Sequence, residues 1–163
     1  MTRIDFYVLP DASEGQRVAT VCRLAEKAVR QSKRVFIHTE CEHLAATLDS
    51  ALWQYRDDSF LPHVTLGAGD HRHGDSVGGS DNGSDNVDAE HTSVEPVAIG
   101  CDRPQPDPQR SILINLGVEV PPFFSRFERT LEVINQQQEI RDSGRARYSY
   151  YQQRGYPLSH HKL

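Results

Sequence analysis

Cysteine and long apolar runs are scarce in this chain, and each scarcity excludes a class of protein. The cysteines number three and form no CxxC pair (Cys22, Cys41 and Cys101). An odd, widely spaced set favours a reducing compartment and a packing role over a disulfide framework. The first ten residues, MTRIDFYVLP, lack the long apolar stretch that a signal peptide or a membrane span needs. We therefore expect a cytoplasmic protein with no membrane contact.

The sequence also lacks the motifs of nucleotide-binding and hydrolytic enzymes. The turn after the first predicted strand, residues 9–15, has the sequence LPDASEG, without the glycine that lets a backbone approach a pyrophosphate. There is no Walker A motif and no GxSxG elbow. Cys22 falls on the apolar stripe of a predicted helix, and Asp5 is a lone carboxylate on a strand. We expect no catalytic site and no cofactor, although an unrecognised hydrolase stays an alternative because fold does not set function.

Acidic residues are concentrated in one low-complexity tract. Residues 67–95 contain seven Asp/Glu and one Arg, a net charge of −6, whereas the whole chain carries −5. The rest of the chain is therefore close to neutral, at about +1. Gly, Ser, Asp and Asn dominate the tract, which predicts a flexible acidic insertion. A length of 163 residues predicts one α/β domain around it.

Alternating strand and helix patterns predict a parallel sheet with crossover helices. Clusters of β-branched and aromatic residues predict strands at 3–9, 35–38, 64–66, 97–99 and 111–116. Apolar spacing predicts a helix after a cap at Asp11 or Ser13, another at 41–53, a short one opened by Pro121-Pro122, and a last one from 136 to 154, ended by Gly155. Residues 129–134 fit either type, and we favour a strand.

Arginine and tyrosine residues are concentrated in the last part of the chain. From Arg141 to Lys162 there are five Lys/Arg against one acidic residue, a net charge of about +4. Arg141, Arg145 and Tyr148 are spaced i, i+4, i+7 and so share one helical face. Such a face on an acidic chain indicates a specific anionic partner. Two alternatives are a solvated helix end and a single-stranded DNA groove, although repulsion from the acidic tract argues against the groove.

Four stretches of sequence resemble one known family. They are DFYVL at 5–9, ALW at 51–53 with SFLPH at 59–63, RSILINL at 110–116, and the run from Arg145 to Tyr156. In this order and spacing the chain resembles the chi subunit of the bacterial DNA polymerase III holoenzyme, over nearly its whole length outside residues 67–95. The resemblance implies a Rossmann-like three-layer sandwich, with a mostly parallel sheet flanked by helices and no nucleotide. It also implies a non-catalytic replication protein located at the replisome.

The resemblance implies a site for the acidic C-terminal tail of single-stranded DNA-binding protein. The residues that match the family's tail site are Arg141, Arg145, Arg147, Tyr148 and Ile134, the last as an apolar pocket wall. Arg141 stands where relatives often have Lys, which preserves the charge. Contact with DNA itself would be indirect.

A second implied surface would bind the psi subunit of the clamp loader, or a helicase in some species. The matching residues are Trp53, Phe60, Leu61, Pro62 and His63. The segment between the two aromatic residues is polar and turn-like, so their rings are candidates for an exposed apolar patch. Asp57, where relatives often have Pro or Ser, departs from the pattern. The alternative is that both rings pack in the core.

Histidines raise the question of a metal site. His71 and His73 lie near Asp70 and Asp75, and two further histidines form the pair at 160–161. Both segments are expected to be mobile, and neither supplies a fixed tetrahedral set of ligands. We therefore expect no specific metal site.

Overall fold

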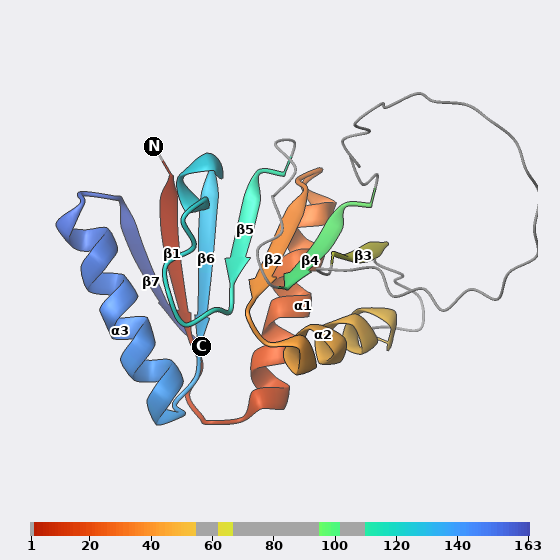
Figure 1. Cartoon of the computed structure of the whole chain (residues 1–163), viewed down its shortest axis with the longest axis horizontal. Coiled ribbons are helices and arrows are strands. Elements are labelled where there is room, and N and C mark those ends of the chain that lie inside the picture. The colour runs from red at the N-terminus through yellow and green to blue at the C-terminus, as the bar shows by residue number, and fades with distance from the viewer. Residues whose placement is uncertain (1, 55–61, 67–94, 102–109) are drawn as a thin grey trace, which may run out of the picture.

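The computed structural model describes residues 2–54, 62–66, 95–101 and 110–163. In this part of the chain the strands form a seven-stranded sheet in the order β3-β4-β2-β5-β6-β1-β7 (Figure 1). The elements are β1 (Arg3–Val8), α1 (Glu14–Arg30), β2 (Val35–Thr39), α2 (Glu42–Gln54), β3 (His63–Leu66), β4 (Val97–Cys101), β5 (Ile112–Asn115), the 3-10 helix η1 (Phe124–Arg126), β6 (Arg129–Ile134), α3 (Gln138–Gln153) and β7 (Leu158–Lys162). No helix among the described residues is long and apolar enough to cross a membrane.

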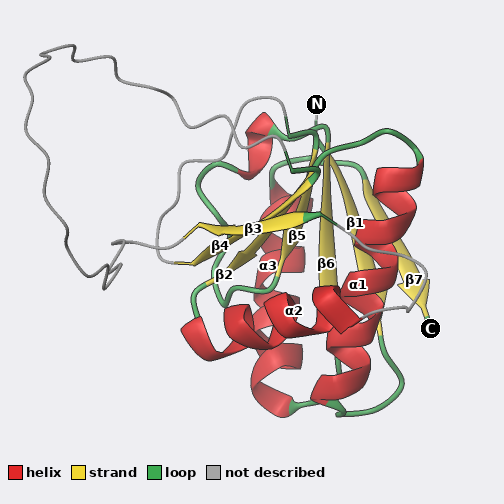
Figure 2. Ribbon diagram, turned by 90° about the vertical axis from the view of Figure 1, so that its right-hand side faces the viewer, coloured by secondary structure: helices red, strands yellow, loops and turns green. Residues whose placement is uncertain are grey.

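Side chains alternate across the sheet and build two apolar clusters, one on each face. Val35 and Ile37 of β2 face the cluster formed with α1 and α2. Phe36, between them, faces the opposite cluster with η1 and Tyr151 of α3. The sheet therefore lies between two helical layers (Figure 2), and each described pair of neighbouring strands is parallel. This confirms the expected Rossmann-like α/β sandwich.

The ends of α1 and α3 follow the expected chemistry. Ser13 caps α1, since its side-chain oxygen accepts a hydrogen bond of 3.3 Å from the backbone N–H of Gln16. Gly155, at a φ of 75°, follows Arg154, the C-cap residue of α3. Cys22 is buried on α1, and burial raises the pKa of its thiol to about 11, as suits a packing residue.

The last strand was not predicted. Residues 158–162 pair in parallel with β1, with Phe6 opposite His160 and Val8 opposite Lys162. The expectation that His160 and His161 lie in a mobile segment was therefore wrong. The strand is polar and lies at the sheet edge, so it lacks the apolar alternation that identifies a strand in a sequence.

A buried carboxylate holds this edge strand to the sheet. Asp5 has no exposed surface. It accepts a hydrogen bond of 2.6 Å from Arg129 Nε, and its other oxygen lies 3.1 Å from His161 Nε2. The His161 ring also stacks on Tyr7, with ring centroids 4.7 Å apart. Asp5 is thus not a lone carboxylate but the point at which β6, β1 and β7 are tied together.

These contacts predict how stability depends on pH. Burial alone raises the pKa of the Asp5 carboxyl, but hydrogen bonds from Arg129 and His161 and the charges of Arg129 and Arg3 outweigh it, and the pKa is lowered. The folded protein then binds fewer protons than the unfolded chain. Stability from Asp5 is therefore present above about pH 4, the ordinary range of an aspartate, and is lost as the pH falls below it.

Asp5→Asn should lower the free energy of unfolding by about 2 kcal/mol at pH 7, because it weakens charged hydrogen bonds. The difference from the unsubstituted protein should shrink as the pH is lowered from 5 to 3. Urea unfolding at several pH values measures both effects. A difference that stays constant over this range would contradict the role given to the Asp5 charge.

Candidate functional site

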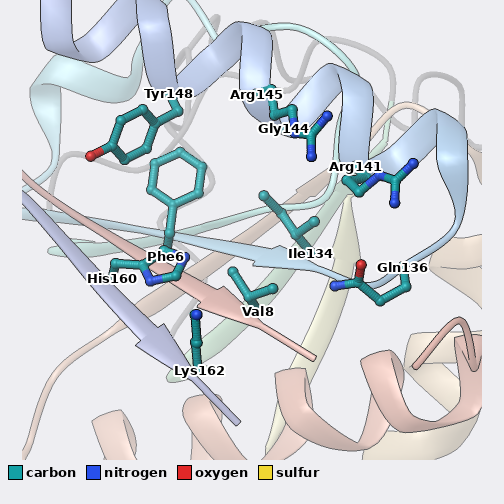
Figure 3. Close-up of a pocket in the computed structure, with 10 residues that line it drawn as sticks. All are labelled: Phe6, Val8, Ile134, Gln136, Arg141, Gly144, Arg145, Tyr148, His160 and Lys162. Atoms are coloured by element: carbon teal, nitrogen blue, oxygen red, sulfur yellow. The ribbon is translucent and has the colours of Figure 1, made fainter. Parts of the chain in front are cut away.

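A groove of about 760 Å³ lies between α3 and the β6-β1-β7 part of the sheet. Its lining residues are Phe6, Val8, Ile134, Gln136, Arg141, Gly144, Arg145, Tyr148, His160 and Lys162. Figure 3 shows the aliphatic side chains of Val8 and Ile134 between the arginines of α3 and the side chains of β7. The groove therefore has an apolar floor with basic residues at its sides.

Close packing at one point sets the distance between α3 and the floor. Gly144 is buried where the helix meets Ile134, and a methyl group in its place would overlap Ile134 Cδ1. The helix touches the sheet here because position 144 has no side chain. Ile134 thereby forms both the base of the helix contact and part of the groove.

The α3 side of the groove presents unpaired positive charge. Arg141 is half-buried, and its Nε lies out of contact with solvent, with no hydrogen-bond partner among the residues that the structure describes. Arg145, one turn further on, is exposed. Among the described residues neither arginine lies within ion-pair distance of an acidic group. Arginine donates paired, planar hydrogen bonds to carboxylates, so this wall suits an acidic ligand.

An aromatic corner closes one end of the groove. Tyr148 is half-buried and meets Phe6 edge to face, with ring centroids 5.2 Å apart. Edge-to-face pairs leave ring surface on which a further aromatic or aliphatic side chain packs favourably. The structure thus brings together four of the five residues expected at the tail site, namely Arg141, Arg145, Tyr148 and Ile134.

Arg147, the fifth, does not reach the groove. Its side chain is buried and donates from Nε to Glu132 Oε2 at 3.0 Å and from Nη1 to the carbonyl of Val118 at 2.9 Å. On α3 it belongs to the buried stripe with Gly144 and Tyr151, not to the face of Arg145. Its placement among the tail-binding residues is therefore corrected: Arg147 holds the helix on the sheet.

Glu132 is the centre of this buried polar network. Besides Arg147, its carboxylate accepts hydrogen bonds from Asn115 Nδ2 at 2.9 Å and from the Tyr151 hydroxyl at 2.8 Å. Burial, with the adjacent carboxylate, raises the pKa of Tyr151 far above its usual range, so the hydroxyl stays protonated and donates. The network fixes α3, and with it the arginine wall of the groove.

A second buried arginine approaches the same strand from the other face. Arg17 of α1 donates from Nε to the carbonyl of Val133 at 2.9 Å. Burial and the nearby charge of Arg147 lower its pKa to about 10, still well above neutral pH. Both helical layers are thus bonded to β6 through arginines.

The second expected surface lies at the opposite end of the sheet. Trp53, at the end of α2, is 56% exposed and meets His63 edge to face at 4.9 Å between ring centroids. His63 Nε2 lies 2.9 Å from Asp49, which holds the ring against the helix. Pro62 is half-buried beside it. Trp53 therefore does not pack in the core, whereas Phe60 and Leu61 lie outside the described residues.

Of the groove residues that come from the sheet, Ile134 was expected and the others were not. His160 and Lys162 were not foreseen because β7 was not, and Phe6 and Val8 were expected only as strand residues. The sequence held one indication of this strand: Leu158, His160 and Lys162 are spaced two residues apart, and they lie on one face of β7. As for metals, the described residues hold no cluster of three or more His, Cys, Asp or Glu arranged around one point. His71 and His73 lie outside those residues.

Fold and groove together define an α/β protein with a basic groove suited to an anionic ligand. The family described as DNA polymerase III chi subunit, HolC, matches residues 1–159. The chain therefore belongs to the DNA polymerase III chi subunit family, and its role is that of an accessory subunit in DNA replication.

Curated relatives agree with this assignment. DNA polymerase III subunit chi of Pseudomonas aeruginosa is 36% identical over 100% of this chain and 98% of its own length. The subunit of Escherichia coli is 27% identical over 98% of this chain and 97% of its own length. Among solved structures, the crystal structure of T4 UvsW matches with a TM-score of 0.62 at 8% identity, covering 99% of this chain. This chain spans 41% of that protein, and the likeness concerns the fold alone.

The two neighbouring arginines of α3 should differ sharply in their effect on stability. Arg147→Ala leaves Glu132 buried without its cation and should lower the free energy of unfolding by about 3–5 kcal/mol. Arg145→Ala removes an exposed side chain and should change it by less than about 0.5 kcal/mol. Urea unfolding followed by circular dichroism compares them, and similar effects of the two substitutions would contradict the assignment of Arg147 to the core.

Proposed function

We propose that this chain is a non-catalytic adaptor that binds the acidic C-terminal tail of single-stranded DNA-binding protein in the groove beside α3. One observation carries the proposal: Arg141 and Arg145 line one wall of a groove that has an apolar floor and no Asp or Glu among its lining residues. Arginine guanidinium groups donate charge-assisted hydrogen bonds to carboxylates, so this wall favours an acidic ligand. The family resemblance supplies the identity of the ligand.

The tail chemistry fits the two parts of the groove. A tail of several Asp residues offers carboxylates to Arg141 and Arg145. Its apolar end, with a terminal aromatic ring, would pack on Ile134 and against Tyr148 and Phe6. Contacts of this size give affinities of micromolar order. Several tails on one single-stranded DNA-binding tetramer would raise the effective affinity.

The second half of the proposal is a link to the clamp loader. The surface around Trp53, Pro62 and His63, with Phe60 and Leu61 outside the described residues, would bind psi. Support comes from the exposed Trp53 ring and from its distance along the sheet from the groove, as β3 and β7 lie at opposite edges. The two partners would then bind at once, in the cytoplasm at the replisome. A helicase that uses the psi surface is an alternative partner there.

Arg145→Ala should weaken binding of the tail at least several-fold, because it removes one cation of the α3 wall. The measurement is calorimetry with a peptide of the last ten or so residues of the host's single-stranded DNA-binding protein, at low and high salt. Salt should weaken the binding, since screened charges attract less. Removal of the terminal aromatic residue of the peptide should abolish it.

Arg126→Ala is a matched control for this experiment. Arg126 is exposed on η1, just before the amino end of β6, whereas Ile134 of the groove ends the same strand. The substitution Arg126→Ala should leave the affinity for the tail unchanged. An unchanged affinity for Arg145→Ala would overturn the site, and binding of an oligonucleotide without any tail peptide would favour the direct single-stranded DNA alternative.

For the second surface, Trp53→Ala should weaken binding to psi of the same organism roughly thirtyfold, as removal of a large aromatic contact residue does. Tail affinity should not change. Val118, which is also exposed, provides the control substitution Val118→Ala. Surface plasmon resonance with immobilised psi compares the three proteins, and equal affinities would remove Trp53 from the interface.

A further inference from the structure

The wall of the groove opposite α3 is formed by the edge strand β7. Strand register places Lys162 beside Val8 and His160 beside Phe6, on the face that lines the groove. Figure 3 shows Lys162 on the other side of Val8 and Ile134 from Arg141 and Arg145. Positively charged side chains therefore border the apolar floor on two walls, α3 and β7. The helical spacing of the arginines had indicated only the α3 wall.

Lys162 lies on a strand that is paired with β1. The backbone N–H of Leu163 donates to the carbonyl of Val8 at 2.9 Å, so pairing with β1 continues past Lys162. On the opposite face, His161 is bonded to the buried Asp5 and stacked on Tyr7. Since alternate side chains of a strand point to opposite faces, the contacts of His161 fix the direction of Lys162.

The charge of Lys162 has no counterpart within the described part of the chain. It is exposed, and no acidic group there lies within ion-pair distance of it. The ten residues that line the groove include no Asp or Glu. A single carboxylate would be satisfied by Arg141 and Arg145 alone. Cations on two walls match a ligand that carries several carboxylates around an apolar segment.

We propose that Lys162 is a tail-binding residue, which holds a second carboxylate of an acidic peptide across the groove from Arg141 and Arg145. The inference rests on the proposed function and adds a residue and a geometry to it. The apolar end of the peptide lies on Val8 and Ile134, with its carboxylates directed to both walls. A lysine ammonium acts as a compact point charge, so its contribution depends on salt more than on orientation.

The test is calorimetry of the tail peptide with Lys162→Ala, Lys162→Glu and Lys162→Arg in the full chain. Lys162→Ala should weaken binding three- to tenfold and flatten its salt dependence. Lys162→Glu should weaken it more than tenfold, and Lys162→Arg should restore most of the affinity because charge is what matters. Lys27→Ala, at an exposed lysine of α1, is the control and should bind as the unsubstituted protein does. Unchanged thermal unfolding shows that β7 stays in place.

The outcomes separate the inference from the proposed function. If Arg145→Ala weakens binding while Lys162→Ala and Lys162→Glu do not, the tail binds at α3 alone and the role of Lys162 is refuted. If the unsubstituted protein does not bind the peptide even at low salt, both the proposed function and the inference fail. A loss for Lys162→Ala that Lys162→Arg restores supports the two-walled site.

Discussion

The position of α3 depends on one carboxylate that is enclosed between the helix and the sheet. Glu132 has no exposed surface and is neutralised by Arg147, with Asn115 and Tyr151 as further donors. Taking a carboxylate out of water is costly, and only a full set of partners offsets that cost. Those partners come from β5 and α3, so the network forms only when the helix lies in this one place. Few apolar residues of α3 are buried, so this network contributes much of what holds the helix on the sheet.

A second buried carboxylate, that of Asp5, fixes the position of β7, which is the other wall of the groove. Asp5 ties β7 to β1 through His161 and to β6 through Arg129. Each wall is thus fixed by a buried acidic group: Glu132 lies between α3 and the sheet, and Asp5 lies on the face of the sheet away from the groove. The cations of the groove, Arg141, Arg145 and Lys162, take no part in either network. They stay available to a ligand because the structural charges are neutralised elsewhere.

Much of the fold and of the groove can be predicted from local sequence patterns. The rest depends on contacts between residues that are far apart in the sequence, which local patterns do not reveal. Clusters of β-branched and aromatic residues predicted the strands other than β6 and β7, and residues 129–134 of β6 fitted either type, with a strand favoured. The spacing of Arg141, Arg145 and Tyr148 predicted that these three residues share one helical face. Arg147 lies two residues after Arg145, a rotation of about 200° around a helix, which already separates it from that face. To predict the structural role of Arg147, one would have to know that Glu132 of β6 lies opposite it in the fold. β7 escaped prediction because an edge strand can be polar, and its partner β1 is more than 150 residues away along the chain.

The walls of the groove are preorganised, which explains why few contacts would suffice for an adaptor that binds its ligand weakly. Both walls are held by networks that exist without a ligand, so the protein gives up little conformational freedom on binding. In the proposed complex, affinity is then set mainly by the charges and the apolar end of the tail. An adaptor that must release one tail and take up another benefits from this balance, because specificity comes from matching two walls and a floor while each single interaction remains weak.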